Sequence, residues 1–259
     1  MPLDVQKAAL ELIEAEREAA PLEPLTSRWP RLSPDEGYAI QDAALSLRLG
    51  RGERIVGVKL GLTSPAKQQR MRVNDPLVAW LTDRMVLEPG ARVPVGSLIH
   101  PRVEPEIVLH MGTPLAGPGV TREQAAAAVA EVRAGLEVID SRYPGYRFAL
   151  SDVIADNASS SSYVLSPDAS GMGEVDLRAE ACRLSLNGDE VAGGTGADVL
   201  GDPLEALVFA ANLLGRRGLR IEEGWTVLTG GITDAVPLGS GDLVEAGFST
   251  LGHVALRAA

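Results

Sequence analysis

The sequence predicts an α+β protein in which strands dominate and helices are inserted irregularly among them. Helical spacing of apolar residues fills most of residues 4–50, and short alternating segments separated by turn signals then continue towards residue 259. A helix does not follow every strand, so the pattern does not fit a doubly wound parallel sheet. We expect an N-terminal helical region, residues 1–52, and a strand-rich domain, residues 53–259.

Composition and charge exclude several classes of protein. The 259 residues are 45% hydrophobic and 23% charged, which is a globular balance. A formal net charge of −11 and only 4% aromatic residues argue against nucleic-acid binding, which needs clustered lysine and arginine. No stretch is apolar enough to span a membrane, and the first 20 residues do not resemble a signal peptide. We therefore expect a cytoplasmic protein. Its single cysteine, Cys182, rules out an intrachain disulfide and a thiolate metal cluster.

Helix starts are marked by capping residues. Ser33 is followed by a proline and, three residues later, by Glu36, which together predict a capping box and a helix that ends near residue 50. A second capping box is predicted at Thr121, with a glutamine three positions on. Asp202 precedes a proline and predicts a further helix that runs to about residue 215.

Alternation of apolar residues predicts the strands. The first runs over residues 54–62, and an Asn187-Gly188 pair between two alternating segments predicts a type I′ hairpin. Further strands are expected at residues 106–110, 136–139, 182–192, 225–228, 243–248 and 252–256.

Three glutamates are candidates for a metal site. Glu104 and Glu106 are two residues apart in an extended segment, so their side chains point to the same face. Glu137 interrupts an apolar strand. Converging carboxylates without a histidine or cysteine are typical of Mg²⁺ or Mn²⁺ ligands, although spacing alone also fits a solvated strand face. Pro105 cannot donate a ladder hydrogen bond, which predicts that this segment lies at a sheet edge or bulge.

Lys59 is the second unusual residue. It lies in the middle of a predicted strand, and its own face carries Gly57 and Gly61, which leave room for a small ligand. A lysine shielded from water is a candidate general acid or base. The alternative is an edge-strand lysine that blocks aggregation. Two polar stretches, residues 140–143 and 156–160, offer hydroxyl and N–H groups to an anion, although such clusters mostly form turns.

Four segments together resemble one known family. They are residues 58–64 (VKLGLTS), 99–107 (IHPRVEPEI), 137–143 (EVIDSRY) and 155–160 (ADNASS), in the family's order and approximate spacing. The family is the 2-oxopent-4-enoate hydratase and 4-oxalocrotonate decarboxylase group of the fumarylacetoacetase-like superfamily. Residues 140–148 and 229–233 are more similar to its decarboxylase branch. The segment 71–79 departs from the family, with Arg72, Asn74 and Ala79 at unusual positions.

The resemblance implies a mixed β-sheet roll with an N-terminal helical part. It implies Mg²⁺, or Mn²⁺ in its place, bound by Glu104, Glu106 and Glu137. Lys59, Asp83 and Ser159 would line the substrate, with Lys59 managing the charge or proton of the developing oxyanion and Asp83 tuning it.

The implied reaction is loss of CO₂ from 2-oxohex-3-enedioate, a small 2-oxo dicarboxylate. A sister hydratase acting on 2-hydroxypenta-2,4-dienoate is the alternative, and a non-catalytic structural subunit of a hydratase complex is the third. The resemblance further implies a homo-oligomer and a complex with the paralogous hydratase.

Overall fold

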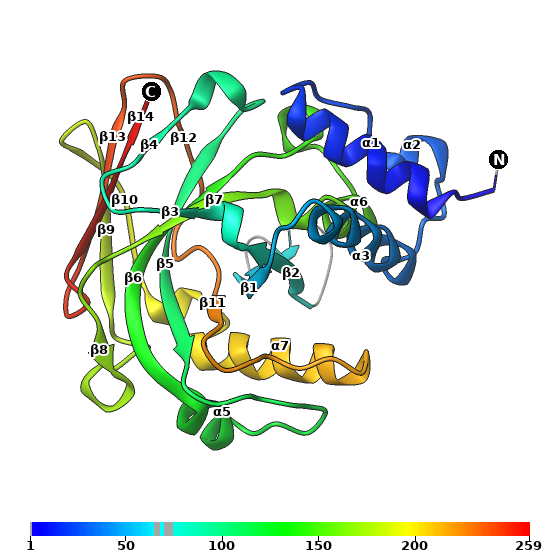
Figure 1. The fold of residues 1–259 in the computed structure, drawn as a ribbon. Coiled ribbons are helices and arrows are strands. Elements are labelled where there is room, and N and C mark those ends of the chain that lie inside the picture. Colours follow the sequence, from blue (N-terminus) through cyan, green and yellow to red (C-terminus); the bar gives the residue numbers. More distant parts are fainter. Residues whose placement is uncertain (1, 65–67, 70–74) are drawn as a thin grey trace.

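Two β-sheets form the centre of the fold in the computed structural model, which describes residues 2–64, 68–69 and 75–259 (Figure 1). Over these residues the larger sheet has nine strands, with the order β2-β1-β11-β5-β6-β7-β3, while β12 pairs with β5 and β8 with β6. Its strands are β1 (Ile55–Gly61), β2 (Leu77–Thr82), β3 (Val86–Leu87), β5 (Arg102–Met111), β6 (Val129–Ile139), β7 (Ser160–Leu165), β8 (Ser170–Gly171), β11 (Thr226–Leu228) and β12 (Val236–Pro237).

The smaller sheet has the order β10-β9-β13-β14-β4 among the described residues. Its strands are β4 (Arg92–Val93), β9 (Ala181–Leu186), β10 (Asp189–Thr195), β13 (Leu243–Phe248) and β14 (His253–Ala258). Strands β13 and β14 contact β6, and β14 also contacts β7, so the two sheets pack face to face. Leu184 and Val244 of the smaller sheet and Val132 and Leu136 of the larger one belong to the same buried core. Both sheets contain parallel and antiparallel pairs, as the expected mixed roll requires.

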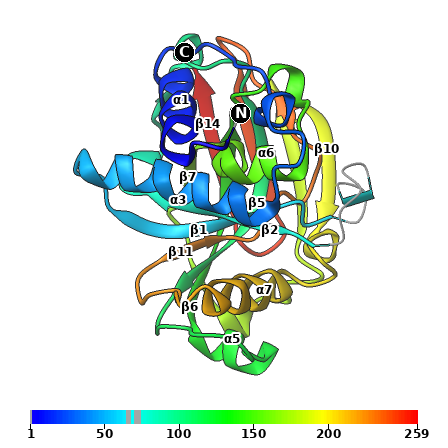
Figure 2. The ribbon, with the colours of Figure 1, turned by 90° about the vertical axis from the view of Figure 1, so that its right-hand side faces the viewer.

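The described residues form six α-helices. They are α1 (Val5–Arg17), α2 (Leu25–Arg28), α3 (Pro34–Gly50), α5 (Arg122–Ala128), α6 (Leu150–Ala155) and α7 (Pro203–Arg216). Helices α6 and α7 contact β2, α1 packs on α3, and α5 packs on α7 and β6. Figures 1 and 2 both place β1 and β2 between α3 on one side and α7 on the other. None of the helices in the described ranges is long and apolar enough to cross a membrane.

The N-terminal helices pack onto the strand-rich part of the chain. Leu12 of α1 and Ile40 of α3 share a buried cluster with Tyr143 and with Ala155 of α6. The Asp152 carboxylate of α6 accepts hydrogen bonds from both the backbone N–H and the hydroxyl of Thr26 in α2, at 2.9 and 2.6 Å. These contacts cross the boundary that we expected at residue 52, and the boundary itself stays a prediction.

The predicted caps and turns are confirmed. Ser33 and Thr121 both form capping boxes, and the side chain of Asp202 caps α7 by accepting from the Leu204 N–H. Asn187 and Gly188 connect β9 to β10 with φ angles of 54° and 92°, as a type I′ turn requires.

The edge position predicted from Pro105 is wrong. Strand β5 is internal, with β6 on one side and β11 and β12 on the other. The Pro105 carbonyl accepts from the Ile232 N–H at 3.0 Å, so its backbone faces the loop between β11 and β12 rather than β6. The missing N–H of proline therefore falls where no ladder bond to a strand is needed.

Close contact between β1 and β11 yields a test of the fold. A Cβ added to Gly57 would lie 2.0 Å from the Thr226 carbonyl oxygen, whereas a Cβ on Gly50 would meet nothing within 4 Å. We expect Gly57→Ala to lower the free energy of unfolding by about 1–3 kcal/mol or more through overpacking. The control Gly50→Ala should change it by less than about 0.5 kcal/mol. Urea denaturation checks both, and equal stability of the two variants would contradict the packing described.

Candidate functional site

The three predicted glutamates converge on one face of the larger sheet. Glu104 and Glu106 are two residues apart on β5, and Glu137 on β6 lies directly opposite Glu104 in the antiparallel register. One carboxylate oxygen from each lies within 4.8 Å of the others. Their exposed fractions are 8%, 0% and 0%, so the solvated strand face is ruled out for this segment.

Burial disfavours the ionised form of the carboxyl groups in this cluster. Burial raises the pKa of Glu106 well above its ordinary value, and the neighbouring Glu137 raises it further, while Lys59 opposes the rise. Burial also raises the pKa of Glu137, again against Lys59. One oxygen of Glu106 accepts from the Gly230 N–H at 2.7 Å, and the other, Oε1, is buried with no hydrogen-bond partner among the described residues. An additional cation would satisfy that oxygen.

Lys59 supplies a positive charge to this cluster. It lies on β1, 2% exposed, between β2 and β11, so the edge-strand alternative does not apply. Its ammonium nitrogen is 2.8 Å from Glu137 Oε2 and donates to the Ala158 carbonyl at 3.3 Å. Burial disfavours the ammonium, but Glu137, Glu106 and Glu104 outweigh this and raise the pKa of Lys59. The lysine is therefore held as a cation.

A left-handed turn brings a further predicted residue to the site. Asn157, Ala158 and Ser159 follow α6 with φ angles of 48°, 53° and 58°. The Ser159 hydroxyl donates to Asp156 at 3.2 Å, and Ser159 lines the cavity described below.

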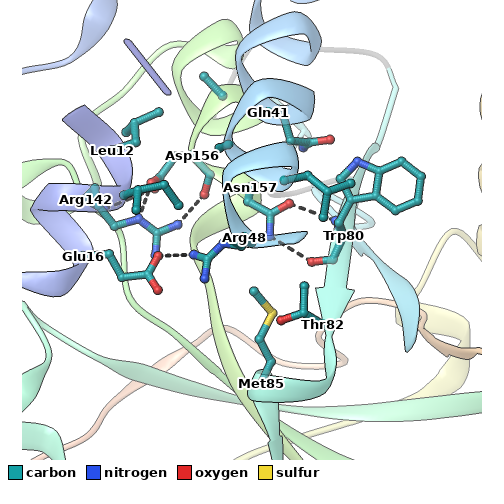
Figure 3. Close-up of a pocket in the computed structure, with 14 residues that line it drawn as sticks. Leu12, Glu16, Gln41, Arg48, Trp80, Thr82, Met85, Arg142, Asp156 and Asn157 are labelled. Atoms are coloured by element: carbon teal, nitrogen blue, oxygen red, sulfur yellow. Dashed lines mark hydrogen bonds and ion pairs between the residues drawn. The ribbon is translucent and has the colours of Figure 1, made fainter. Parts of the chain in front are cut away.

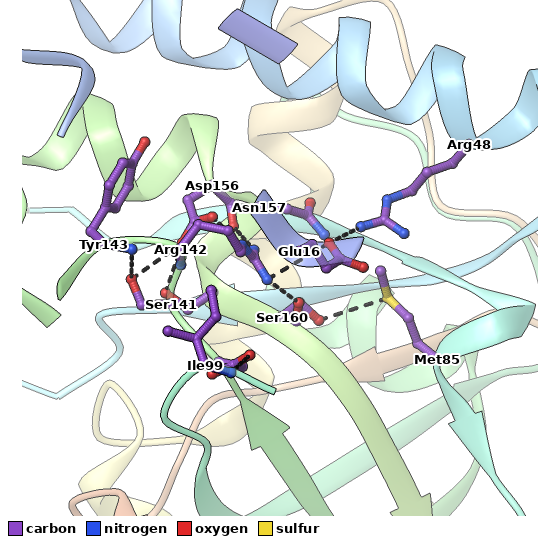
Figure 4. Close-up of polar contacts among 12 residues, drawn as sticks. Glu16, Arg48, Met85, Ile99, Ser141, Arg142, Tyr143, Asp156, Asn157 and Ser160 are labelled. Atoms are coloured by element: carbon purple, nitrogen blue, oxygen red, sulfur yellow. Dashed lines mark hydrogen bonds and ion pairs between the residues drawn. The ribbon is translucent and has the colours of Figure 1, made fainter. Parts of the chain in front are cut away.

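Arg142 binds the residues on either side of this turn, Asp156 and Ser160 (Figure 4). Its Nε donates to an oxygen of Asp156, and its Nη1 donates to the Ser160 carbonyl at 3.1 Å. The arginine side chain is 3% exposed. Burial raises the pKa of Asp156 to about 6, although Arg142 lowers it. Arg142 thus holds the segment that carries Ser159, and each of its three guanidinium nitrogens donates a hydrogen bond to that segment.

A cavity of about 380 Å³ opens beside Glu104, Lys59 and Ser159. The other residues that line the cavity are mostly apolar, apart from the cation Arg102 and the acid Asp234. They are Gly61, Leu62, Leu77, Arg102, Ile139, Tyr146, Phe148, Val153, Ala158, Asp234 and Ala235. The volume suits a small organic acid.

Arg102 was missed in the sequence. Its guanidinium lies 4.6 Å from the ring centroid of Tyr146, and both residues line the cavity. The sequence does contain a signal for it: Arg102 lies two residues before Glu104 on β5, and alternation places the two side chains on one face. From this segment, only the glutamates were predicted as site residues.

Asp83 does not join the cluster. It follows β2 and accepts from the backbone N–H and the Nε of Arg54, at 3.0 and 3.1 Å. It is absent from the residues that line the cavity. The structure therefore gives no support to its predicted tuning of Lys59. Of the unusual segment 71–79, residues 71–74 lie outside the described residues, and Ala79 is buried on β2.

Two glycines let the loop after β11 approach the acids closely. Gly230 has a φ of 110°, which favours glycine, and its N–H reaches Glu106. A Cβ on Gly231 would lie 2.6 Å from a Glu104 carboxylate oxygen. This loop therefore lies directly against two of the three glutamates.

Comparisons with known proteins agree with this fold. The fumarylacetoacetate (FAA) hydrolase C-terminal family model matches residues 54–258, so the chain belongs to that family. A 4-oxalocrotonate decarboxylase of Pseudomonas putida is 40% identical over 243 residues, covering 94% of this chain and 92% of its own. A 2-hydroxyhexa-2,4-dienoate hydratase of Comamonas testosteroni is 36% identical over 248 residues, with 95% and 94% coverage.

A solved structure is also closely similar. It is the 4-oxalocrotonate decarboxylase from Pseudomonas putida G7, complexed with magnesium and adipate. The TM-score is 0.97 at 37% identity, and the match covers 100% of this chain and 99% of the other.

The carboxylate cluster predicts divalent-cation binding. Glu106→Gln keeps the side-chain volume but removes a charge and one anionic oxygen, so we expect Mn²⁺ affinity to fall at least about 10-fold. The control Asp83→Asn removes a charge outside the cluster and should leave the affinity within about twofold. Isothermal titration with Mn²⁺ measures both. Equal affinities in Glu106→Gln and the wild type would refute the assignment of the acids.

Proposed function

We propose that the protein is a Mg²⁺-dependent carbon–carbon lyase. It decarboxylates 2-oxohex-3-enedioate (4-oxalocrotonate) to 2-hydroxypenta-2,4-dienoate and CO₂, as in the meta-cleavage catabolism of aromatic compounds. The observation that carries the proposal is the convergence of three buried glutamates and Lys59 beside a cavity of about 380 Å³. Its similarity to decarboxylases over nearly the whole chain supports the reaction.

The residues present fit a hard divalent cation. Glu104, Glu106 and Glu137 would hold it, because the three offer only oxygen ligands and one oxygen of Glu106 lacks a hydrogen-bond partner in the described chain. Mn²⁺ shares this preference and could replace Mg²⁺. When bound, the ion supplies Lewis-acid polarisation of the 2-oxo group.

Charge flow in the substrate defines what the protein side chains must stabilise. The bond between C5 and C6 breaks and releases CO₂, and its electron pair forms a double bond between C4 and C5. The former alkene pair moves to C2–C3, and the carbonyl pair ends on the C2 oxygen, which then takes a proton. Lys59, held as an ammonium in the cavity wall, stabilises the negative charge on that oxygen.

The cavity suits a dianion with a short carbon chain. Lys59 and Arg102 bring positive charge to its wall, although the protein as a whole is acidic. Leu62, Leu77 and Phe148 provide an apolar surface for the carbons and exclude water from the departing carboxylate. The Ser159 hydroxyl would position a substrate carboxylate.

The hydratase reaction is the alternative function. The relative from Comamonas testosteroni supports it, at 36% identity against 40% for the Pseudomonas putida decarboxylase. A hydratase would add water to 2-hydroxypenta-2,4-dienoate and release no CO₂. A purely structural subunit would not need an ion pair buried as deeply as Lys59 and Glu137.

We also propose that the protein works in the cytoplasm as a homo-oligomer and associates with the paralogous hydratase. The product of the proposed decarboxylation is the compound that such a hydratase consumes, which supports this pairing. Light scattering of the purified protein, alone and mixed with the hydratase, tests both assemblies; monomeric mass in both samples would refute them.

The reaction is tested with the purified protein and 2-oxohex-3-enedioate. We expect CO₂ release with Mg²⁺ and its loss after chelation with EDTA. Lys59→Met should lower kcat about 100-fold or more, because the cation that stabilises the oxyanion is gone. Manometry and dienoate absorbance follow the two products. Normal Mg²⁺ binding without CO₂ release would rule out the decarboxylase, and hydration of the dienoate would then identify the hydratase.

A further inference from the structure

At Trp80, one side-chain carboxamide binds the free edge of β2. Strand β2 ends the larger sheet in the described part of the chain, so the backbone groups of Trp80 turn outward. The Asn157 side chain contacts both of them (Figure 3): its Oδ1 accepts from the Trp80 N–H at 2.8 Å, and its Nδ2 donates to the Trp80 carbonyl at 2.9 Å. One side chain thus replaces a neighbouring strand at this residue.

The segment that begins with Asn157 has an unfavourable backbone conformation. Asn157, Ala158 and Ser159 have consecutive positive φ angles, and none of them is glycine. Each such residue costs on the order of 1 kcal/mol, least for asparagine. A conformation of this kind persists only where surrounding contacts hold it. Asp156, which pairs with Arg142, anchors the chain just before this segment, and Asn157 anchors the first residue of the segment to β2.

The same turn carries groups of the proposed site. The Ala158 carbonyl accepts from Lys59, and Ser159 lines the cavity. Directly after the turn, the Ser160 hydroxyl donates to Glu137 at 3.3 Å. A shift of the turn would therefore move the carbonyl oxygen that accepts from the Lys59 ammonium, and it would move Ser159 in the cavity wall. The glutamates on β5 and β6 would keep their positions, because the ladder between those strands fixes them.

We propose that Asn157 is a positioning residue that locks the left-handed turn onto β2 and so places Lys59 and Ser159 for the substrate. Asn157 contacts no reacting atom and acts through these two residues. The proposal rests on the function proposed above. It separates the binding of the dicarboxylate, which depends on the turn, from the binding of the metal ion, which depends on the sheet.

A matched variant separates this role from a general loss of stability. Gln41 on α3 also binds the free edge of β2, with its Nε2 donating to the Val78 carbonyl at 3.2 Å and to the Ile154 carbonyl at 2.9 Å. Gln41→Ala removes buried hydrogen bonds from the same strand but leaves the turn contacts intact. Asn157→Ala removes the clamp. Asn157→Gly removes the clamp and also relieves the strain at that position, so it offers a folded protein if Asn157→Ala is unstable.

The test compares adipate and Mn²⁺ binding by titration calorimetry, together with kcat, KM and the melting temperature. We expect Asn157→Ala and Asn157→Gly to weaken adipate binding to the Mn²⁺-loaded protein at least about 10-fold and to lower kcat by a similar factor. Mn²⁺ affinity should stay within about twofold. Gln41→Ala should lower the melting temperature while keeping adipate affinity and kcat within about twofold of the wild type.

Two results would overturn the proposal. One is wild-type adipate affinity and kcat in both Asn157 variants; the other is an equal loss in Gln41→Ala. The proposed function fails by a different result: the wild-type protein would release no CO₂. The adipate and Mn²⁺ titrations would still test the role of Asn157 in that case.

Discussion

The crowding of three buried carboxylates on two adjacent strands is the constraint on which the site depends. Glu104, Glu106 and Glu137 share one face because β5 and β6 pair in a single register, and a slip of one residue would turn Glu137 to the opposite face. Such a cluster persists only where cations balance it and the frame cannot relax. Lys59 supplies one positive charge from within the chain. Strand β5 is held in place because it pairs with strands on both sides.

The helical region reaches this site through half-buried ion pairs. Glu16 of α1 pairs with Arg48 of α3, and one of its oxygens lies 3.8 Å from Arg142. Arg142 in turn holds Asp156 at the start of the left-handed turn (Figure 4). The N-terminal helices are therefore part of the support of the cavity wall, although they contribute no glutamate to the cluster.

Local rules predicted much of this arrangement from the sequence. Alternation placed Glu104 and Glu106 on one face, and an acid within an apolar strand marked Glu137. Capping residues predicted the starts of α3, α5 and α7, and the Asn187-Gly188 pair predicted the β9–β10 hairpin. These signals all lie within a few residues of the feature that they predict.

Features that depend on distant parts of the chain were not predictable in this way. Pro105 indicated an edge strand, but a loop more than 120 residues later meets its backbone. Asp83 was placed in the site by resemblance alone, while its contacts are with Arg54. Asn157 read as one polar residue in a turn, because its partner, Trp80, lies 77 residues away. Lys59 stayed ambiguous until the sheet order showed that β1 is internal.

A crystal structure of the protein soaked with Mn²⁺, measured at a wavelength with strong manganese anomalous scattering, tests the central claim most directly. We predict one anomalous peak bounded by carboxylate oxygens of Glu104, Glu106 and Glu137, with cavity water or added adipate on its open side. Clear density for all three side chains with no peak between them, or a peak at another site only, would contradict the account.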